Sequence, residues 1–212
     1  MKLRFTCSDC GRKQSMIIWS VCVLVDKKAN KSVVIYENEV RCKSCGSAHM
    51  ISDYAGLSAA ALHKVVKPDY DEIILARDII IIENKSMPFS EARPYIERRI
   101  QEEPHNGELR LRHANHLRKL NEYDEAIKEY EESLRLNENL IASLLNLCDI
   151  FLYRHKEYKE KGALEKARDY FEKMVSLYRS GKAVFTTIED TKTIPIWIRE
   201  RKTLLYPKKK RR

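Results

Sequence analysis

Two short stretches of the 212-residue sequence decide the fold of its N-terminal part: Cys7–Gly11, which reads CSDCG, and Cys42–Gly46, which reads CKSCG. Each is a Cys-x-x-Cys-Gly turn, a spacing that aims two sulfurs at one point. The glycine after the second cysteine lets backbone amides turn toward the sulfurs and partly offset their charge. Together the turns predict one site with four thiolate ligands, which are Cys7, Cys10, Cys42 and Cys45.

Four thiolates form a closed tetrahedral shell, which leaves no position for a reactive water. We therefore predict one structural metal ion, not a catalytic one. The alternatives are a surrogate ligand, His49, or a pair of redox dithiols, which matching glycines disfavour. The other two cysteines, Cys22 and Cys148, are interpreted as small buried hydrophobic residues.

Between the two turns, the β-prone runs 15–25 and 33–40 are separated by a polar, Lys-rich segment and predict a β-hairpin. Cysteine pair, hairpin and cysteine pair together resemble the zinc-ribbon family over residues 1–52. The resemblance implies Zn²⁺ as the cofactor. Rubredoxins have similar cysteine pairs, but their aromatic-rich, proline-bearing loop has no counterpart here, which favours zinc over iron.

A 34-residue period runs through the middle of the chain. The segment Tyr123–Leu136 matches residues around Phe89 and Ala92 at a distance of 34, and residues around Ala167 at 34 plus 7. A helical period of 34 residues is typical of tetratricopeptide repeats, which this region resembles. We predict repeats at 73–106, 107–140 and 141–181, with a seven-residue insertion in 154–162.

The predicted fold class is α+β: a small zinc ribbon joined to an all-α solenoid of about three repeats. A linker helix is predicted within 53–72, because Asp53–Val66 is Ala-rich and apolar at helical spacing. Residues 182–206 would cap the last repeat, since a solenoid end exposes an apolar face. The basic tail 207–212 is predicted to be disordered because its charges repel one another.

The net charge of +9 is concentrated at the two ends of the chain. Residues 1–67 carry 11 Lys and Arg against 5 Asp and Glu, and residues 181–212 carry 10 against 3. The middle, residues 68–180, has 19 against 23. Basic ends favour an anionic partner. No apolar run reaches the length of a membrane span or a signal peptide, so we predict a cytoplasmic protein without a membrane partner.

The sequence contains no Gly-rich phosphate loop, no His-Glu-x-x-His motif and no Gly-x-Ser-x-Gly motif, and we predict that the protein is not an enzyme. A pair of histidines, His113 and His116, lacks an acidic partner to complete a metal site. The predicted function is an adaptor that binds a protein or peptide. The alternatives are a nucleic-acid-associated protein, whose ribbon and tail contact phosphates, and a regulatory subunit of a larger enzyme.

The peptide is expected in the concave groove that the first helix of each repeat lines in tetratricopeptide proteins. In the second repeat this helix is basic and the next one is acidic, so the peptide should be acidic or end in a carboxylate. Asn115 and Asn146 match the amides of a carboxylate clamp, although Leu111 and Ala142 replace its lysines. The candidate groove residues are Arg77, Arg112, Asn115, Lys119, Asn146 and Asp149. The candidates for contact with an anionic surface are Lys208, Lys209, Lys210, Arg211 and Arg212.

Overall fold

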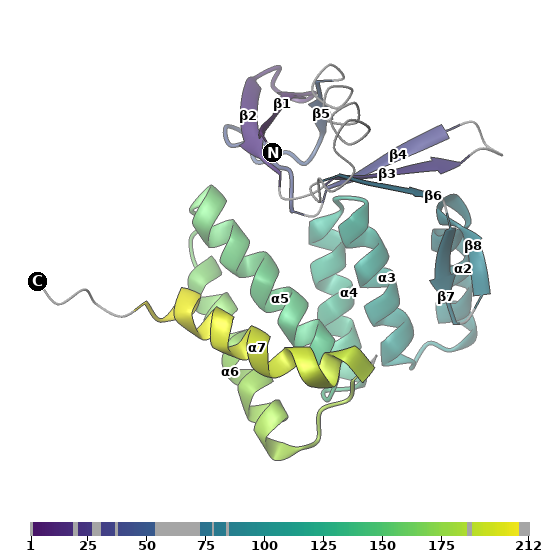
Figure 1. The fold of residues 1–212 in the computed structure, drawn as a ribbon, viewed down its shortest axis with the longest axis vertical. Coiled ribbons are helices and arrows are strands. Elements are labelled where there is room, and N and C mark those ends of the chain that lie inside the picture. The colour runs from purple at the N-terminus through teal and green to yellow at the C-terminus, as the bar shows by residue number, and fades with distance from the viewer. Residues whose placement is uncertain are drawn as a thin grey trace, which may run out of the picture. The chain divides into compact units, whose positions relative to one another are not determined.

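A computed structural model of the chain describes residues 2–18, 21–26, 31–36, 38–53, 73–77, 79–83, 85–185 and 188–207. These residues form an α+β fold of short N-terminal strands followed by helices (Figure 1). The chain divides into two compact units. The first unit combines Met1–Glu97 with Asn115–Tyr123, and the second combines Arg98–Ala114 with Asp124–Arg212.

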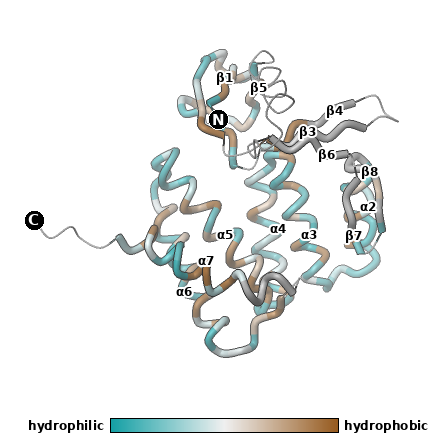
Figure 2. Tube along the Cα trace, viewed as in Figure 1, coloured by the Kyte–Doolittle hydropathy of each residue, from teal (hydrophilic) through white to brown (hydrophobic). Residues whose placement is uncertain are grey.

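The first unit begins with a three-stranded antiparallel sheet of order β2-β1-β5, made of Lys2–Cys7 (β1), Lys13–Ile17 (β2) and Met50–Ser52 (β5). Along β1, exposed and buried residues alternate, as expected for a sheet with one solvated face. Hydrophilic and hydrophobic segments are visible along this part of the tube in Figure 2. The buried face carries Leu3, Phe5 and Met16.

A second sheet has the order β4-β3-β6 and consists of Val21–Asp26 (β3), Lys31–Tyr36 (β4) and Ile73–Arg77 (β6). Strands β3 and β4 form the antiparallel hairpin that the sequence predicts, while β6 is parallel to β3. The predicted first strand, 15–25, is in fact divided: its beginning belongs to β2 and its end to β3. The rings of Phe5 and Tyr36 meet edge to face, with centroids 5.4 Å apart.

Strands also occupy residues for which the 34-residue period predicts a helix. Besides β6, a hairpin of Ile79–Ile82 (β7) and Lys85–Pro88 (β8) precedes the first described helix. The prediction of a first-repeat helix in 73–88 is therefore wrong. This segment is rich in isoleucine, and the preference of β-branched side chains for strands outweighs the weak repeat signal.

The helices that follow repeat with the predicted spacing. Phe89–Glu102 (α2) and Tyr123–Leu136 (α4) begin and end 34 residues apart, as do Gly107–Lys119 (α3) and Ile141–Tyr153 (α5). Equivalent residues have the same environment: Ala92 and Ala126 are fully buried, and so is Ala167 in Ala163–Ser180 (α6). The sequence period thus corresponds to a structural period.

Gly107 shows why one turn between these helices requires glycine. A Cβ atom at this position would lie 2.9 Å from the Ser133 carbonyl oxygen, closer than side-chain atoms approach backbone. The preceding residue, Asn106, caps α3, because its side-chain oxygen accepts hydrogen bonds from the amides of Glu108 and Leu109 at 3.1 and 3.2 Å.

In the second unit, α5 supplies much of the core, since nine of its thirteen residues are buried. It continues into a π-helical turn, Arg154–Tyr158, inside the region where the sequence predicts an insertion. The last helix, Ile188–Leu205 (α7), runs beside α6 (Figure 1). The Arg168 side chain of α6 donates a 3.0 Å hydrogen bond to the Leu205 carbonyl of α7. A C-terminal helix packed on the preceding one agrees with the predicted cap.

Two sequence predictions lie outside the described residues: most of the linker helix, at 54–72, and the charged part of the tail, at 208–212. Among the described residues, no helix is both long enough and apolar enough to cross a membrane.

Candidate metal centre

The two cysteine turns have nearly the same backbone geometry. In the first, the Gly11 amide donates to the Cys7 carbonyl at 2.9 Å, and in the second, the Gly46 amide donates to the Cys42 carbonyl at 2.9 Å. The φ angles of the two glycines are 69° and 77°. This left-handed conformation is costly for residues with a Cβ atom, which explains the glycine in each motif.

The four sulfurs converge, as the sequence predicts. All lie within 4.8 Å of one another, and the pairs Cys7–Cys45 and Cys10–Cys42 are separated by 3.6 Å between Sγ atoms. Sulfurs bound at about 2.3 Å to one tetrahedral ion are about 3.8 Å apart. Their separation therefore fits a single metal ion. Cys7 and Cys42 are buried, whereas Cys10 and Cys45 are exposed.

The electrostatics of the cluster favours a cation at its centre. The amides of Cys45 and Ser44 point at the Cys42 sulfur and lower its pKa to about 6, although burial opposes them. For Cys45, the Ser47 amide lowers the pKa, but burial and the three neighbouring sulfurs together raise it to about 12. Four thiolates so close together repel one another, so full ionisation requires a positive ion between them.

Gln14 fastens the second cysteine turn to the sheet. Its side-chain nitrogen donates to the Arg41 carbonyl at 3.2 Å, and its side-chain oxygen accepts from the Lys43 amide at 3.1 Å. The two bonds hold the residues on either side of Cys42. The sequence analysis missed this residue, although the alternation of β2 places Gln14 on the same face as buried Met16, where a polar side chain needs a specific partner.

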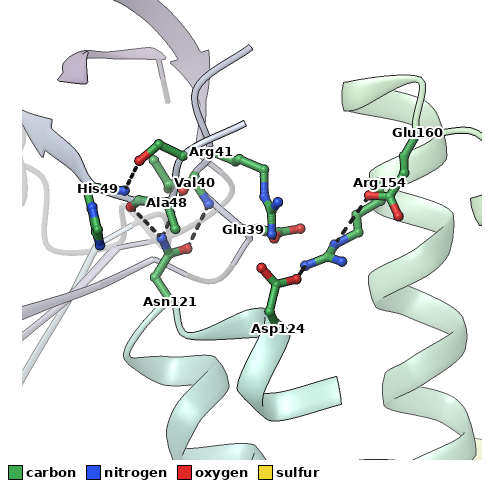
Figure 3. A network of polar contacts seen from close by, with 10 residues as sticks. Glu39, Val40, Arg41, Ala48, His49, Asn121, Asp124, Arg154 and Glu160 are labelled. Carbon is green, nitrogen blue, oxygen red and sulfur yellow. Dashed lines mark hydrogen bonds and ion pairs between the residues drawn. The ribbon is translucent and has the colours of Figure 1, made fainter. Parts of the chain in front are cut away.

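Asn121 makes a second contact that the sequence analysis missed. It follows α3 with a φ of 66°, and its side chain pairs with the backbone of Val40 (Figure 3). The amide of Val40 donates to the Asn121 side-chain oxygen at 2.8 Å, and the Asn121 side-chain nitrogen donates to the Val40 carbonyl at 2.9 Å. Asn121 therefore imitates a neighbouring β-strand and anchors the chain just before Cys42.

His49 lies near the cysteines but outside the cluster. Its Nδ1 is 3.2 Å from a carboxylate oxygen of Asp9, and both side chains are largely exposed. The contact lowers the pKa of Asp9, together with a stronger hydrogen bond from Ser47. Within the described part of the chain, the four cysteines are the group whose ligand atoms are close enough to share a metal ion.

The candidate groove residues have different environments. On α3, Arg112 and Asn115 are half-buried and Lys119 is exposed, and their spacing of three and seven residues places them on one face of the helix. On α5, Asn146 and Asp149 stand 34 residues after Arg112 and Asn115.

Two of the groove candidates depart from the prediction. Arg77 is the last residue of strand β6, not part of a repeat helix. Asp149 is bound by Arg201 of α7 through two hydrogen bonds of 2.9 and 2.7 Å. While α7 is in place, the Asp149 carboxylate is therefore engaged by the chain itself.

The two histidines of α3 are buried, with His113 8% and His116 3% exposed. Nδ1 of His113 is 3.5 Å from the Glu129 carboxylate, which also accepts from Arg110 at 3.2 Å. Burial is the largest influence on Glu129 and raises its pKa, but His113 and Arg110 together outweigh it and hold the pKa below its usual value.

In comparisons with known proteins, no protein-family model matches the chain, and no curated protein matches its sequence. The geometry of the four cysteines is thus the functional feature on which the structure speaks most directly: a site that could hold one metal ion.

Proposed function

We propose that the protein is a non-enzymatic zinc-binding adaptor, in which a metal-stabilised N-terminal sheet accompanies tetratricopeptide-like repeats that bind a peptide. The observation that carries the proposal is the structural period: α3 and α5 begin and end 34 residues apart, as do α2 and α4. Arrays with such a period generally act by binding partners along their concave surface.

Zinc is the proposed ion because four thiolates form a closed shell that suits it, and because a closed shell serves folding and not catalysis. Iron is the competing ion for four cysteines. Elemental analysis of protein purified without added metal distinguishes them, and an Fe–S₄ centre would also colour the solution. Iron at one equivalent would overturn the zinc assignment but leave the adaptor proposal standing.

The proposed binding surface is the face of α3 that carries Arg112, Asn115 and Lys119, extended by Asn146 at the position on α5 that corresponds to Arg112. Two positive charges and two amides suit a peptide that is acidic or ends in a free carboxylate. The negative charge of α4, which contains five Asp and Glu against two Lys and Arg, would keep such a peptide from the opposite helix.

The test measures binding of acidic peptides with free and with amidated C-termini to the full chain. Arg112→Glu combined with Lys119→Glu should weaken capture by roughly 10-fold or more, since each charge-assisted hydrogen bond contributes about 1.5–3 kcal/mol when shielded from water. The matched control, Lys161→Glu with Lys182→Glu, makes the same charge change at exposed positions elsewhere and should bind as the parent does. Equal binding by parent and groove variant would refute the proposed surface.

A second candidate function is association with nucleic acid, which the excess positive charge of both chain ends supports. Deletion of Lys208 to Arg212 should then weaken retention on a nucleic-acid column without changing the melting temperature. Binding through phosphates must fall steeply with salt, whereas binding in a peptide groove should depend on salt only weakly.

A further inference from the structure

The sheet β2-β1-β5 has one face that is not used to form the core. In β1, Leu3, Phe5 and Cys7 point to the buried side, so Lys2, Arg4 and Thr6 point to the other. The strand registers extend this second face across the sheet: Lys2 stands opposite Ile17, Arg4 opposite Ser15, and Thr6 between Lys13 and Ile51. We name it the outer sheet face; its residues are Lys2, Arg4, Thr6, Lys13, Ser15, Ile17 and Ile51.

The outer sheet face is positively charged and well exposed. Lys2, Arg4 and Lys13 are all exposed, and the three strands contain no Asp or Glu. Among the described residues, no acidic side chain forms an ion pair with any of these three. The nearest acid in sequence is Asp53, which follows β5 and whose amide donates to the Arg4 carbonyl at 2.7 Å. The face therefore keeps a net positive charge.

The charges are spaced in a regular pattern. Lys2 and Arg4 are two residues apart on one strand, about 7 Å, and Arg4 and Lys13 are diagonal neighbours on adjacent strands, about 7–8 Å. Hydroxyl groups of Thr6 and Ser15 lie between the charges and can donate further hydrogen bonds. Such a row of cations and donors matches a chain of regularly spaced anions better than a single small anion.

The shape of the face restricts the class of polyanion. Three strands spaced about 4.8 Å apart make a face roughly 10 Å wide, enough for one extended strand. None of its residues is aromatic, so it offers no platform for stacking bases and would recognise the backbone. Ile17 and Ile51, 68% and 62% exposed, lie toward the two edges and could contact sugars or bases without selecting among them.

We propose that the outer sheet face binds single-stranded nucleic acid through its phosphates, independently of sequence and of the sugar. The cysteine site lies at the end of the same strand, because Cys7 closes β1, so the metal would hold the strands that present these charges in register. This site is separate from the α3 surface proposed for peptides, and each can fail without the other.

The experiment is fluorescence anisotropy of the full chain with labelled 15-nucleotide poly-U and poly-dT at several salt concentrations. The variant Lys2→Gln, Arg4→Gln, Lys13→Gln should bind both oligonucleotides at least about 10-fold more weakly at low salt, and the slope of log K against log salt should become shallower by about 2. A charge-conserving variant, Lys2→Arg, Arg4→Lys, Lys13→Arg, should bind as the parent does.

The matched control removes the same charge elsewhere, with Lys161→Gln, Lys182→Gln and Lys202→Gln, all at exposed positions. It should leave binding nearly unchanged, and metal content and melting temperature should match the parent in every variant. If the control weakens binding as much as the face variant, or if neither does, the outer sheet face is not the binding site. If polyglutamate competes as well as poly-dT, the face recognises acidic protein instead and the proposal is wrong.

Discussion

The N-terminal sheet and the helix α5 bury apolar side chains in very different amounts. The inner face of the sheet buries three large side chains, Leu3, Phe5 and Met16, whereas α5 alone has nine buried residues. A small sheet gains little free energy from so few side chains and needs a cross-link, while a helix pair with a continuous apolar face does not. In this chain the stabilisation of one region is concentrated in four atoms, and that of the other is distributed over many.

Removal of the metal site should therefore have the largest effect, and it should be confined to one region. Cys42→Ala is expected to lose the metal and unfold the N-terminal sheet, because metal binding contributes roughly 10 kcal/mol or more to folding at such sites. Helical circular dichroism should persist. Metal content and amide exchange of β1 and β5 measure the result.

Cys148→Ala is the matched control for this experiment, since Cys148 is also buried but belongs to α5. It should keep one equivalent of metal and lower stability only slightly. Collapse of the helices in Cys42→Ala would show that the two regions do not differ in the way described.

A cavity in α5 should produce the second-largest effect and the opposite distribution. Leu147 is fully buried, and Leu147→Ala is expected to destabilise the helical region by about 2–5 kcal/mol through lost contacts and an unfilled cavity. Thermal unfolding followed at 222 nm measures this loss. The metal content should remain that of the parent, and loss of metal would contradict the comparison.

The Asn121 contact is expected to have an intermediate effect on the N-terminal sheet. Asn121→Gly keeps the left-handed backbone but removes both hydrogen bonds to Val40, which should cost about 1–3 kcal/mol. Asn121→Ala should cost about 1 kcal/mol more, because alanine is strained at a φ of 66°. Faster hydrogen exchange of the Val40 amide reports the lost contact directly. An unchanged exchange rate in both variants would exclude the role assigned to the side chain.

The smallest effect should come from Glu129, and it should depend on pH. Because its pKa in the folded chain is held below the usual value, its ionised form stabilises the fold above the ordinary carboxylate pKa, and this contribution disappears as pH falls through the lowered pKa. Glu129→Gln should be less stable than the parent by about 1 kcal/mol at pH 7 and equal to it in strong acid. A stability difference that is constant from pH 7 to pH 3 would contradict the assignment.

The parts of the structure that the sequence predicts are those encoded by local spacing. The four cysteines converge because two identical turns carry them, and the helices follow the 34-residue period because buried Ala126 and its equivalents define it. Strands β6 to β8 were missed because the period extends a helical pattern over a segment whose isoleucines prefer strands.

Other features depend on contacts between distant residues and leave little trace in the local sequence. Asn121 is 81 residues from Val40, and Asp149 is 52 residues from Arg201. Each of these residues also has an ordinary reading, as a helix-terminating asparagine or a solvent-facing charge. Only the tertiary arrangement shows that the first supports the backbone before Cys42 and that the second is engaged by α7.

The π-helical turn after α5 makes the two helices of that pair equally long. The thirteen residues of α5 and the five of the turn total eighteen, the same as α6, while α3 and α4 have thirteen and fourteen. Both arms have thus grown by about one helical turn at the end where they are joined. Growth at a shared loop raises the height of a helical hairpin and leaves the older contacts below it in register, so the length of one repeat can vary without forcing its neighbours to change.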